Sequence, residues 1–273
     1  MPQLSPLSHQ LLALNAAFYE QTAESFSDSR DYFWAGWEKI IPLLPNFPQS
    51  ELHCLDLGCG NARFAEFLAQ HISSHQILKY TGTDNSSNLL NLAKDRLNQK
   101  VLSNLSLPLH LQTSFQLDLL DLSDLAAIKK YLAAQPKSEL ITLFGVLHHL
   151  PEVSFRQQLL ETLISHLTPQ GFLIVSLWQF MKDHRLAGRV LPNADFPVHI
   201  SPQQLESGDY LLDWQRDQIS PHAHLRFCHH FSDAEVDQLV KSLTTQTQIR
   251  LAARWQADGP QNNPLNCYLV FQK

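Results

Sequence analysis

Short apolar runs alternate with amphipathic stretches through the middle of this chain, and this alternation constrains the fold more than any other feature. The apolar runs cover residues 52–57, 79–84, 109–117, 140–146 and 172–178. Stretches with apolar residues at helical spacing follow the first four runs, as at Phe64, Phe67, Leu68 and Ile72. Repeated strand–helix units are typical of parallel strands with helices on both faces of the sheet. The sequence therefore predicts an α/β, doubly wound fold.

Three regions lie outside this alternation. Residues 1–50 form an N-terminal arm, with a helix expected around residues 11–23, then an aromatic stretch and a proline-containing linker. Residues 51–273 form the main domain, which carries an insertion at residues 181–230 after the fifth strand. Two apolar runs near the C-terminus, separated by a segment rich in Gly, Asn and Pro, predict a hairpin at the sheet edge. We expect the arm to lie over a site at the end of the sheet.

The composition supports one domain with a buried core. Of the 273 residues, 44% are hydrophobic and 17% are charged, which excludes a disordered chain. The net charge of −6 provides no overall basic field, so any binding of nucleic acid must rest on a local surface. The four cysteines form no CxxC pair, and we find no leader peptide and no apolar run of bilayer length. We therefore expect a soluble, cytoplasmic protein that does not bind membranes.

A glycine-containing turn follows the first strand, where the segment from Leu55 to Arg63 reads LDLGCGNAR. Glycine lets the backbone approach a ligand closely, and the first turn of a helix offers free N–H groups. Dinucleotide-binding turns have a third glycine where this chain has Arg63. Asp56 suits an ammonium or sulfonium group better than a pyrophosphate. The turn therefore predicts a site for a nucleotide-like ligand that carries positive charge.

Acidic residues close the next two strands as well. Asp84 lies 24 residues after Gly60, near the interval at which a carboxylate accepts hydrogen bonds from ribose hydroxyls. Asp118 ends the third strand, where a carboxylate can accept a hydrogen bond from an adenine amino group. The carboxyl ends of parallel strands meet at the crevice where such sheets bind ligands. We expect Asp56, Asp84 and Asp118 to converge there.

As a set, these residues resemble the glycine-rich motif, the ribose acid and the adenine acid of class I S-adenosylmethionine-dependent methyltransferases. Residues 144–150, FGVLHHL, look like the fourth motif of that family, and residues 167–172, LTPQGF, look like its approach to the fifth strand. The chain departs from the family at Ala62 and Gln170, where many members have glycine. The resemblance covers roughly residues 50–180. It implies a Rossmann-like, seven-stranded methyltransferase sheet whose last strand is antiparallel.

The resemblance also implies S-adenosyl-L-methionine as the cofactor, and no metal. The residues expected to bind the cofactor come from the arm and from the strand ends: Tyr19, Arg30, Trp37, Asp56, Gly58, Gly60, Asn61, Asp84, Asn85, Asp118, Leu119, Phe144 and Gly145. His148 and His149 suggest a metal or a base, but no carboxylate or cysteine lies at ligand spacing beside them in the sequence. We therefore predict a structural role for both histidines.

Segments outside the core resemble one subfamily of these methyltransferases. Residues 18–20, residues 23–30 and the tryptophans Trp34 and Trp37 look like the N-terminal arm of the tRNA wobble-uridine methyltransferases that esterify a carboxymethyl group. Residues 226–231, RFCHHF, and the turn at residues 259–266 look like two further segments of those enzymes. The resemblance implies tRNA as the acceptor. The alternative is that the aromatic residues only pack the arm onto the domain.

Two residues are the candidates for catalysis. A carboxylate acceptor with a pKa near ~4 is ionised at neutral pH and needs no base, and the sequence offers no evident base. Arginine suits a bidentate grip on a carboxylate. We predict that Arg226 orients the acceptor carboxylate, that His229 assists by a hydrogen bond, and that the product is a methyl ester. The alternative is an ordinary ion-paired Arg226.

The charge of the insertion limits the RNA hypothesis. Residues 181–230 carry a net charge of −1 and six histidines. Binding of tRNA would require a one-sided arrangement of Arg185, Arg189 and Arg226, or a helper subunit. Two other functions stay open, methylation of a small-molecule metabolite and a non-catalytic role as an S-adenosylmethionine-binding partner subunit. The complete set of glycines and acids favours an enzyme.

Overall fold

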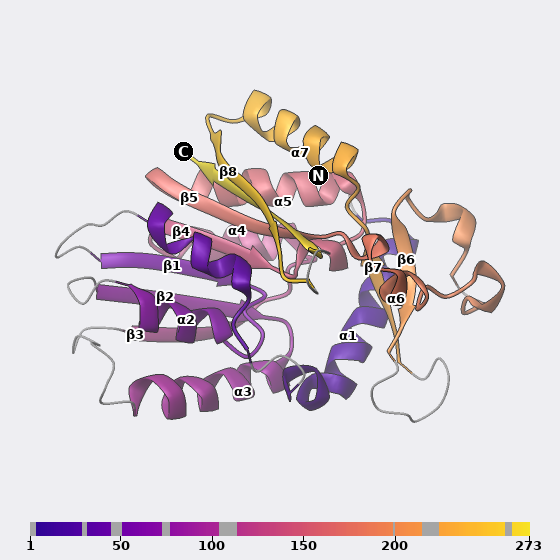
Figure 1. The fold of residues 1–273 in the computed structure, drawn as a ribbon, viewed down its shortest axis with the longest axis horizontal. Coiled ribbons are helices and arrows are strands. Elements are labelled where there is room, and N and C mark those ends of the chain that lie inside the picture. The colour runs from indigo at the N-terminus through magenta and orange to yellow at the C-terminus, as the bar shows by residue number, and fades with distance from the viewer. Residues whose placement is uncertain are drawn as a thin grey trace.

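A seven-stranded sheet with the order β3-β2-β1-β4-β5-β9-β8 forms the centre of the molecule (Figure 1). The computed structural model describes residues 4–28, 32–44, 51–72, 77–103, 114–198, 200–214, 224–259 and 264–273. The strands are β1 (Glu51–Leu57), β2 (Ile77–Asp84), β3 (Ser114–Leu119), β4 (Ser138–Phe144), β5 (Leu167–Trp178), β8 (Arg250–Ala257) and β9 (Asn266–Gln272). Strands β1 to β5 are parallel, and β9 is antiparallel to both β5 and β8. The predicted sheet with an antiparallel last strand is confirmed.

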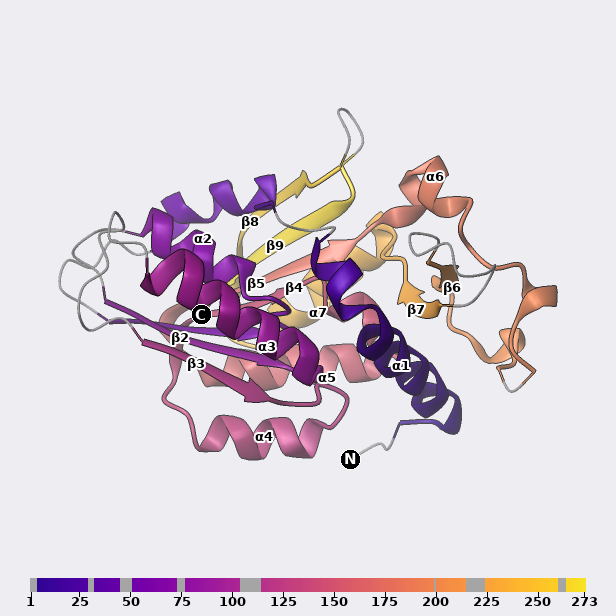
Figure 2. The same cartoon turned by 90° about the horizontal axis from the view of Figure 1, so that it is seen from below.

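Helices cover both faces of the sheet, as expected from the strand–helix alternation. Helices α2 (Arg63–His71) and α3 (Ser87–Arg96) pack on one face, and α4 (Leu125–Ala133), α5 (Val153–His166) and α7 (Asp233–Gln246) pack on the other (Figure 2). Side-chain N-caps fix the starts of three of these helices, since the side chains of Ser86, Asp124 and Ser232 accept hydrogen bonds from backbone N–H groups of α3, α4 and α7. None of the helices in the described residues is both long enough and apolar enough to cross a bilayer.

The N-terminal arm begins with α1 (Pro6–Asp28), which lies beyond the carboxyl ends of the strands (Figure 1). This helix is longer than the sequence predicts, and it packs against α3 and against a strand of the insertion. Leu11 and Phe18 are buried in that contact. After it, 3₁₀ turns at Ala35–Lys39 and Ile41–Leu43 carry the chain along β8 and β9, where the N–H of Gly36 donates to the Asp258 carboxylate at 2.9 Å. The arm therefore contacts the insertion through α1 and the segment after β8 through its 3₁₀ turns.

The insertion contains a two-stranded hairpin that the sequence analysis did not predict. Strands β6 (Asp209–Asp213) and β7 (Leu225–His229) pair antiparallel, and the short helix α6 (His184–Ala187) precedes them. Only part of the predicted strand at residues 109–117 is described, and β3 there continues to Leu119. Strand β5 begins at Leu167 rather than Phe172, because backbone hydrogen bonds between residues 170–171 and Lys273 hold this segment on the sheet.

Candidate active site

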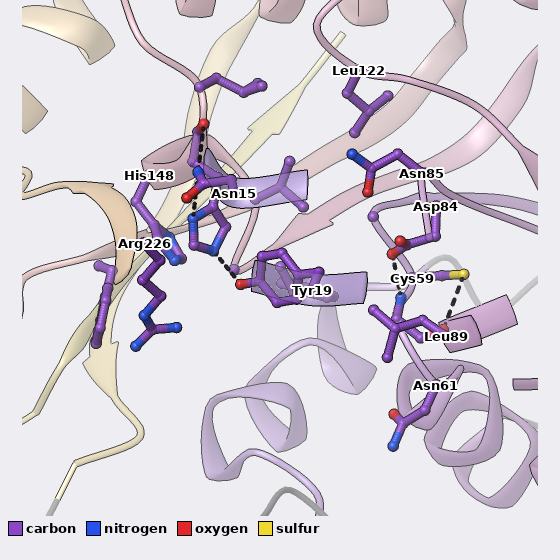
Figure 3. A pocket seen from close by; sticks show the side chains of 18 of the residues that line it. Asn15, Tyr19, Cys59, Asn61, Asp84, Asn85, Leu89, Leu122, His148 and Arg226 are labelled. Carbon is purple, nitrogen blue, oxygen red and sulfur yellow. Dashed lines mark hydrogen bonds between the residues drawn. The ribbon is translucent and has the colours of Figure 1, made fainter. Parts of the chain in front are cut away.

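A cavity of about 990 Å³ lies at the carboxyl ends of β1, β2 and β4, beneath α1 and the insertion. Its volume is at the upper end of the range for sites that bind small molecules. Figure 3 shows two groups of side chains in its wall, with Asp84, Asn85 and Cys59 on one side and His148 and Arg226 on the other. We call the first group, with Asp56, Gly58, Gly60 and Asn61, the glycine end. The second group, with Trp178, Arg185, Arg189 and Trp214, is the arginine end.

The backbone of the glycine end requires glycine. Gly58 has φ +71°, and a Cβ atom there would lie 2.3 Å from a methyl carbon of Val146, so a larger residue would clash as well as strain the backbone. The N–H groups of Gly58 and Cys59 donate to the carbonyl of Thr83 at 2.7 and 2.8 Å, which ties the turn to β2. Gly60 has φ +55°, and no atom lies within 4 Å of the place that a Cβ atom would take there, so its backbone is open to a ligand.

Two buried carboxylates lie in the wall of the glycine end. Asp84 accepts hydrogen bonds from the N–H groups of Gly60 at 3.0 Å and Ser86 at 2.9 Å. Asp56 accepts hydrogen bonds from the hydroxyls of Tyr80 at 2.6 Å and Thr142 at 2.7 Å. Burial raises the pKa of both acids, that of Asp56 to about 6, although the hydrogen bonds oppose the shift. A bound cation would stabilise the ionised form of each carboxylate.

Aromatic rings of the arm line the cavity beside the glycine end. Trp34 and Trp37 line the cavity, and the Arg63 guanidinium lies 5.6 Å from the centroid of each ring. Burial lowers the pKa of Arg63 to about 10, and its guanidinium donates to the Tyr32 carbonyl at 2.8 Å. The indole N–H of Trp37 is buried without a hydrogen-bond partner among the described residues. Such a donor in a cavity wall is a feature that a ligand acceptor would satisfy.

At the arginine end, Arg226 is enclosed by three aromatic rings. Its guanidinium carbon lies 5.2 Å from the centroid of Trp178, 5.5 Å from Trp214 and 5.4 Å from Phe18, and the side chain is 6% exposed. No carboxylate among the described residues forms an ion pair with this guanidinium. Aromatic faces hold a guanidinium by cation–π attraction and leave its N–H edge for planar anions. The arginine end therefore offers an anion site.

A tyrosine–histidine contact lies between the two ends. The hydroxyl of Tyr19 is 2.6 Å from Nε2 of His149, which belongs to the 3₁₀ turn at Leu147–His149 after β4. The Nδ1 atom of His149 is 3.2 Å from the carbonyl of Phe227 on β7. Asn15 of α1 donates to the His149 carbonyl at 3.3 Å and accepts from the Phe227 N–H at 2.8 Å. These contacts join the arm, the sheet and the insertion at the cavity wall.

Most of the residues predicted from the sequence lie together in this cavity. Its wall contains Tyr19, Trp37, Asp56, Gly58, Gly60, Asn61, Asp84, Asn85, Phe144, Gly145 and Arg226. Arg30 lies outside the described residues. The structure does not bring Asp118, Leu119 or His229 to the cavity wall.

Asp118 lies on the other side of its strand from the position that the sequence analysis assigned to it. Its carboxylate accepts hydrogen bonds from the hydroxyl of Tyr131 and the amide of Gln116, both at 2.6 Å, while Leu119 is exposed. The strand continues for one residue after Asp118, and successive side chains of a strand point in opposite directions. Residues 120–123, which follow the strand, line the cavity instead.

His229 faces away from the cavity, in contrast to the assisting role predicted for it. Its Nδ1 is 2.6 Å from Asp209, and its Nε2 is 2.8 Å from Glu235. His229 and Arg226 are three positions apart on β7, so their side chains leave opposite faces of the strand. The structure therefore separates His229 from the anion site at Arg226.

Several residues of the cavity wall were not predicted as site residues from the sequence: Asn15, Arg63, Asp121, Trp178, Trp214 and Asp258. The wall also contains Trp34, which was named only as part of the arm, and His148 and His149, for which a structural role was predicted. Arg63 could have been found, because it begins the helix that follows the glycine turn. The tryptophans at positions 178 and 214 carry no local signal, since they approach Arg226 only through the folding of the insertion.

Comparison with known proteins finds a matching family for the central part of the chain. Residues 55–173 match the family described as "Methyltransferase domain". A curated relative, the tRNA (carboxymethyluridine(34)-5-O)-methyltransferase of Arabidopsis thaliana, is 26% identical over 160 residues. That match covers 59% of this chain and only 31% of the relative's length.

Solved structures show the same fold. An S-adenosylmethionine-dependent methyltransferase from Methanosarcina mazei superimposes with a TM-score of 0.58 at 18% identity, covering 85% of this chain and 97% of that one. The 1,6-didemethyltoxoflavin-N1-methyltransferase of Burkholderia thailandensis, solved with its substrate and S-adenosylhomocysteine, gives a TM-score of 0.56 at 13% identity. That match covers 100% of this chain and 92% of the other.

Proposed function

We propose that this chain, a class I S-adenosylmethionine-dependent methyltransferase, transfers the methyl group of its cofactor to a carboxylate oxygen and produces a methyl ester. The fold and the family match support S-adenosylmethionine as the cofactor. The charge of the cavity supports a carboxylate as the acceptor. More specifically, we propose that the acceptor is the carboxymethyl group of a tRNA wobble uridine.

The glycine end fits S-adenosylmethionine, which supplies a methyl group on a positively charged sulfur. Asp56 and Asp84 give this end a negative charge that suits a cation, and the unpartnered indole N–H of Trp37 can donate to a ligand. The open backbone at Gly60 leaves room for close approach. These residues bind and orient the cofactor, while the arm above them excludes water.

The two ends of the cavity have opposite charges, and this observation is the main support for a carboxylate acceptor. Two buried carboxylates lie at the glycine end, and Arg226 lies at the other, enclosed by aromatic rings. A cationic methyl donor and an anionic acceptor would each meet an opposite charge there, so binding alone brings them together. A carboxylate is already ionised at neutral pH, so the transfer needs no base.

The tRNA form of the proposal rests on sequence rather than on the cavity. It is supported by the match to the tRNA methyltransferase of Arabidopsis thaliana and by the arm that looks like that of the wobble-uridine enzymes. The overall charge of −6 opposes unaided binding of RNA. We therefore propose a helper subunit that supplies the basic surface, and a cytoplasmic location where tRNA is modified.

The test compares Arg226→Lys with the wild type in a methyl-transfer assay. A lysine cannot reproduce the planar fork of arginine, so we expect kcat/KM to fall by about tenfold or more while cofactor affinity is nearly unchanged. The matched control is Arg254→Lys, because Arg254 lies on β8 outside the cavity and pairs with Asp237. Equal activity of Arg226→Lys and wild type would remove Arg226 from acceptor binding.

The product distinguishes the acceptor classes. A methyl ester releases methanol in mild alkali, whereas an alkali-stable methyl group would exclude ester formation. Mass spectrometry of tRNA nucleosides and small acids from cells with and without the gene identifies the acceptor. The net charge of −1 in residues 181–230 opposes unaided RNA binding, so a small carboxylic acid is the second candidate. That candidate predicts a changed metabolite and unchanged tRNA nucleosides.

A further inference from the structure

Three side chains with metal-binding atoms meet beside the arginine end of the cavity, and two of them line the cavity. His148 and His149 belong to the 3₁₀ turn after β4, and Cys228 belongs to β7 of the insertion. One ligand atom from each lies within 4.8 Å of the others, and the Cys228 sulfur is 3.9 Å from Nδ1 of His149. The sequence places no cysteine near the two histidines, so only the folding of the insertion creates this group.

The donor set suits zinc. Two imidazoles and one thiolate are borderline-soft ligands that favour Zn²⁺ over Mg²⁺ or Ca²⁺. Zinc bonds of about 2.0–2.3 Å in a tetrahedral site place neighbouring ligand atoms roughly 3.5 Å apart. The present separations therefore need side-chain shifts of at most about 1 Å to reach that geometry. Three protein ligands would leave a fourth position open.

The surroundings would hold the ring of His149 in the required orientation. With Nδ1 bound to a metal in place of its present contact with the Phe227 carbonyl at 3.2 Å, Nε2 would carry the proton and donate to the Tyr19 oxygen, 2.6 Å away. Metal-binding histidines commonly donate their second N–H in this way. Because His148 and His149 line the cavity, the open position would face the space near Arg226.

The second group of possible ligands in the described residues is already neutralised by a protein cation. Glu206, Asp209 and His229 also approach within 4.8 Å. The Arg156 guanidinium lies 3.3 Å from both Glu206 and Nε2 of His229 and occupies the place of a cation. The group formed by His148, His149 and Cys228 instead offers two imidazoles and a thiol, the donor types that zinc prefers.

We propose that His148, His149 and Cys228 bind one Zn²⁺ whose open coordination position accepts an anionic oxygen of the acceptor beside Arg226. The role toward the acceptor rests on the proposed function, whereas the binding of the metal does not. The two are therefore tested separately, by metal titration and by methyl transfer.

The first experiment titrates the metal-free, reduced full-length chain with Co²⁺, a coloured substitute for Zn²⁺. We expect one equivalent to bind with a thiolate-to-cobalt charge-transfer band, and Zn²⁺ to abolish the band. Cys228→Ala should lose the band and bind Zn²⁺ more weakly by at least about tenfold. Cys54→Ala is the matched control, since Cys54 is an equally buried strand cysteine away from the group, and it should retain the band. Absence of the band in the wild type, or its persistence in Cys228→Ala, would overturn the proposal.

The second experiment needs no variant and so does not depend on folding of Cys228→Ala. Iodoacetamide labels the unaltered chain with and without Zn²⁺, and peptide mass spectrometry follows each cysteine. We expect Zn²⁺ to slow labelling at Cys228 by about tenfold and to leave Cys54, Cys59 and Cys267 unchanged. Equal rates at Cys228, or equal slowing at all four, would contradict the site. Confirmed metal binding with an alkali-stable product would instead contradict only the proposed acceptor.

Discussion

The two buried carboxylates of the glycine end differ in how they are held. Both oxygens of Asp84 accept backbone N–H groups, from Gly60 and Ser86, so this residue fixes the turn as well as facing the cavity. Asp56 is held by the hydroxyls of Tyr80 and Thr142 from neighbouring strands. The position of the Asp84 carboxylate therefore depends on the local geometry of the turns that it contacts, whereas that of Asp56 depends on the packing of neighbouring strands.

A change at Asp84 tests its contact with the cofactor. We expect Asp84→Ala to weaken S-adenosylmethionine binding by about 1–3 kcal/mol, because ribose hydroxyls would lose their acceptor. Asp118→Ala is the matched comparison, since Asp118 lies outside the cavity wall and contacts Tyr131. Isothermal calorimetry measures both affinities. A larger loss in Asp118→Ala than in Asp84→Ala would restore the sequence-based assignment of Asp118 to adenine.

The raised pKa of Asp56 predicts pH-dependent binding of the cofactor. Burial raises the pKa of Asp56 to about 6 in the free protein, and a bound cation lowers it again, so binding releases a proton. If only the ionised form binds, affinity should rise about tenfold from pH 5 to pH 7. Calorimetry at several pH values measures this slope, and Asp56→Asn should flatten it. An unchanged slope in Asp56→Asn would assign the titration to another group such as Asp84.

Among the elements, the hairpin of β6 and β7 is held to the core by a buried polar network. Arg156 of α5 donates to the Leu150 carbonyl at 3.0 Å and lies 3.3 Å from Glu235 of α7. His229 of β7 contacts Asp209 on the paired strand as well as Glu235. This network fixes the strand that carries Arg226, so His229 is a positioning residue for the proposed anion site.

The stability contributed by His229 should depend on pH. Burial lowers the pKa of His229, but hydrogen bonds to Asp209 and Glu235 outweigh that effect and raise it above its ordinary value of about 6.5. A raised histidine pKa gives stability that is complete below about pH 6.5 and is lost as pH rises through the folded value. We expect the difference in Tm between wild type and His229→Gln to be largest near pH 6 and to shrink by pH 9.

The same variant also has a kinetic consequence. If His229 only positions β7, then His229→Gln should raise KM for the acceptor more than it lowers kcat. A loss of kcat with unchanged KM would indicate that His229 contributes directly to the transfer step and would contradict its placement away from the cavity.

In the whole molecule, the ends of the sheet strands and the loops that follow them form one side of the cavity, and the arm and the insertion form much of the other. Residues of α1, of positions 32–37 and of the insertion all line the space above the strand ends. A ligand in this position contacts parts of the chain that are far apart in sequence. Its binding should therefore stabilise the fold as a unit.

Thermal unfolding measures that effect. S-adenosylmethionine or S-adenosylhomocysteine at about 100 times its Kd should stabilise the folded state by about 2.7 kcal/mol and raise Tm by about 5–10 °C. NAD⁺ is the control ligand, because Asp56 opposes a pyrophosphate and position 63 lacks the third glycine of a dinucleotide-binding turn. An equal rise with NAD⁺ would contradict the selectivity inferred for the glycine end.

Features that depend on neighbouring residues could be predicted from the amino-acid sequence alone. Alternating apolar patterns predicted most of the strands and helices, and Gly58 and Gly60 marked the turn after β1 that lines the cavity. These features follow from hydrogen bonds and backbone preferences that span only a few positions. They were enough to predict the fold class and the glycine end of the cavity.

Which side chains reach the remaining parts of the cavity depends on contacts between segments that are far apart in the chain. Asp118 lies on the face of β3 that contacts Tyr131, and the alternation of side chains along β7 separates His229 from Arg226. The aromatic rings around Arg226 and the approach of Cys228 to His149 join segments far apart in the chain. Side-chain direction at a strand end and contacts across an insertion depend on non-local packing, which no short sequence pattern specifies.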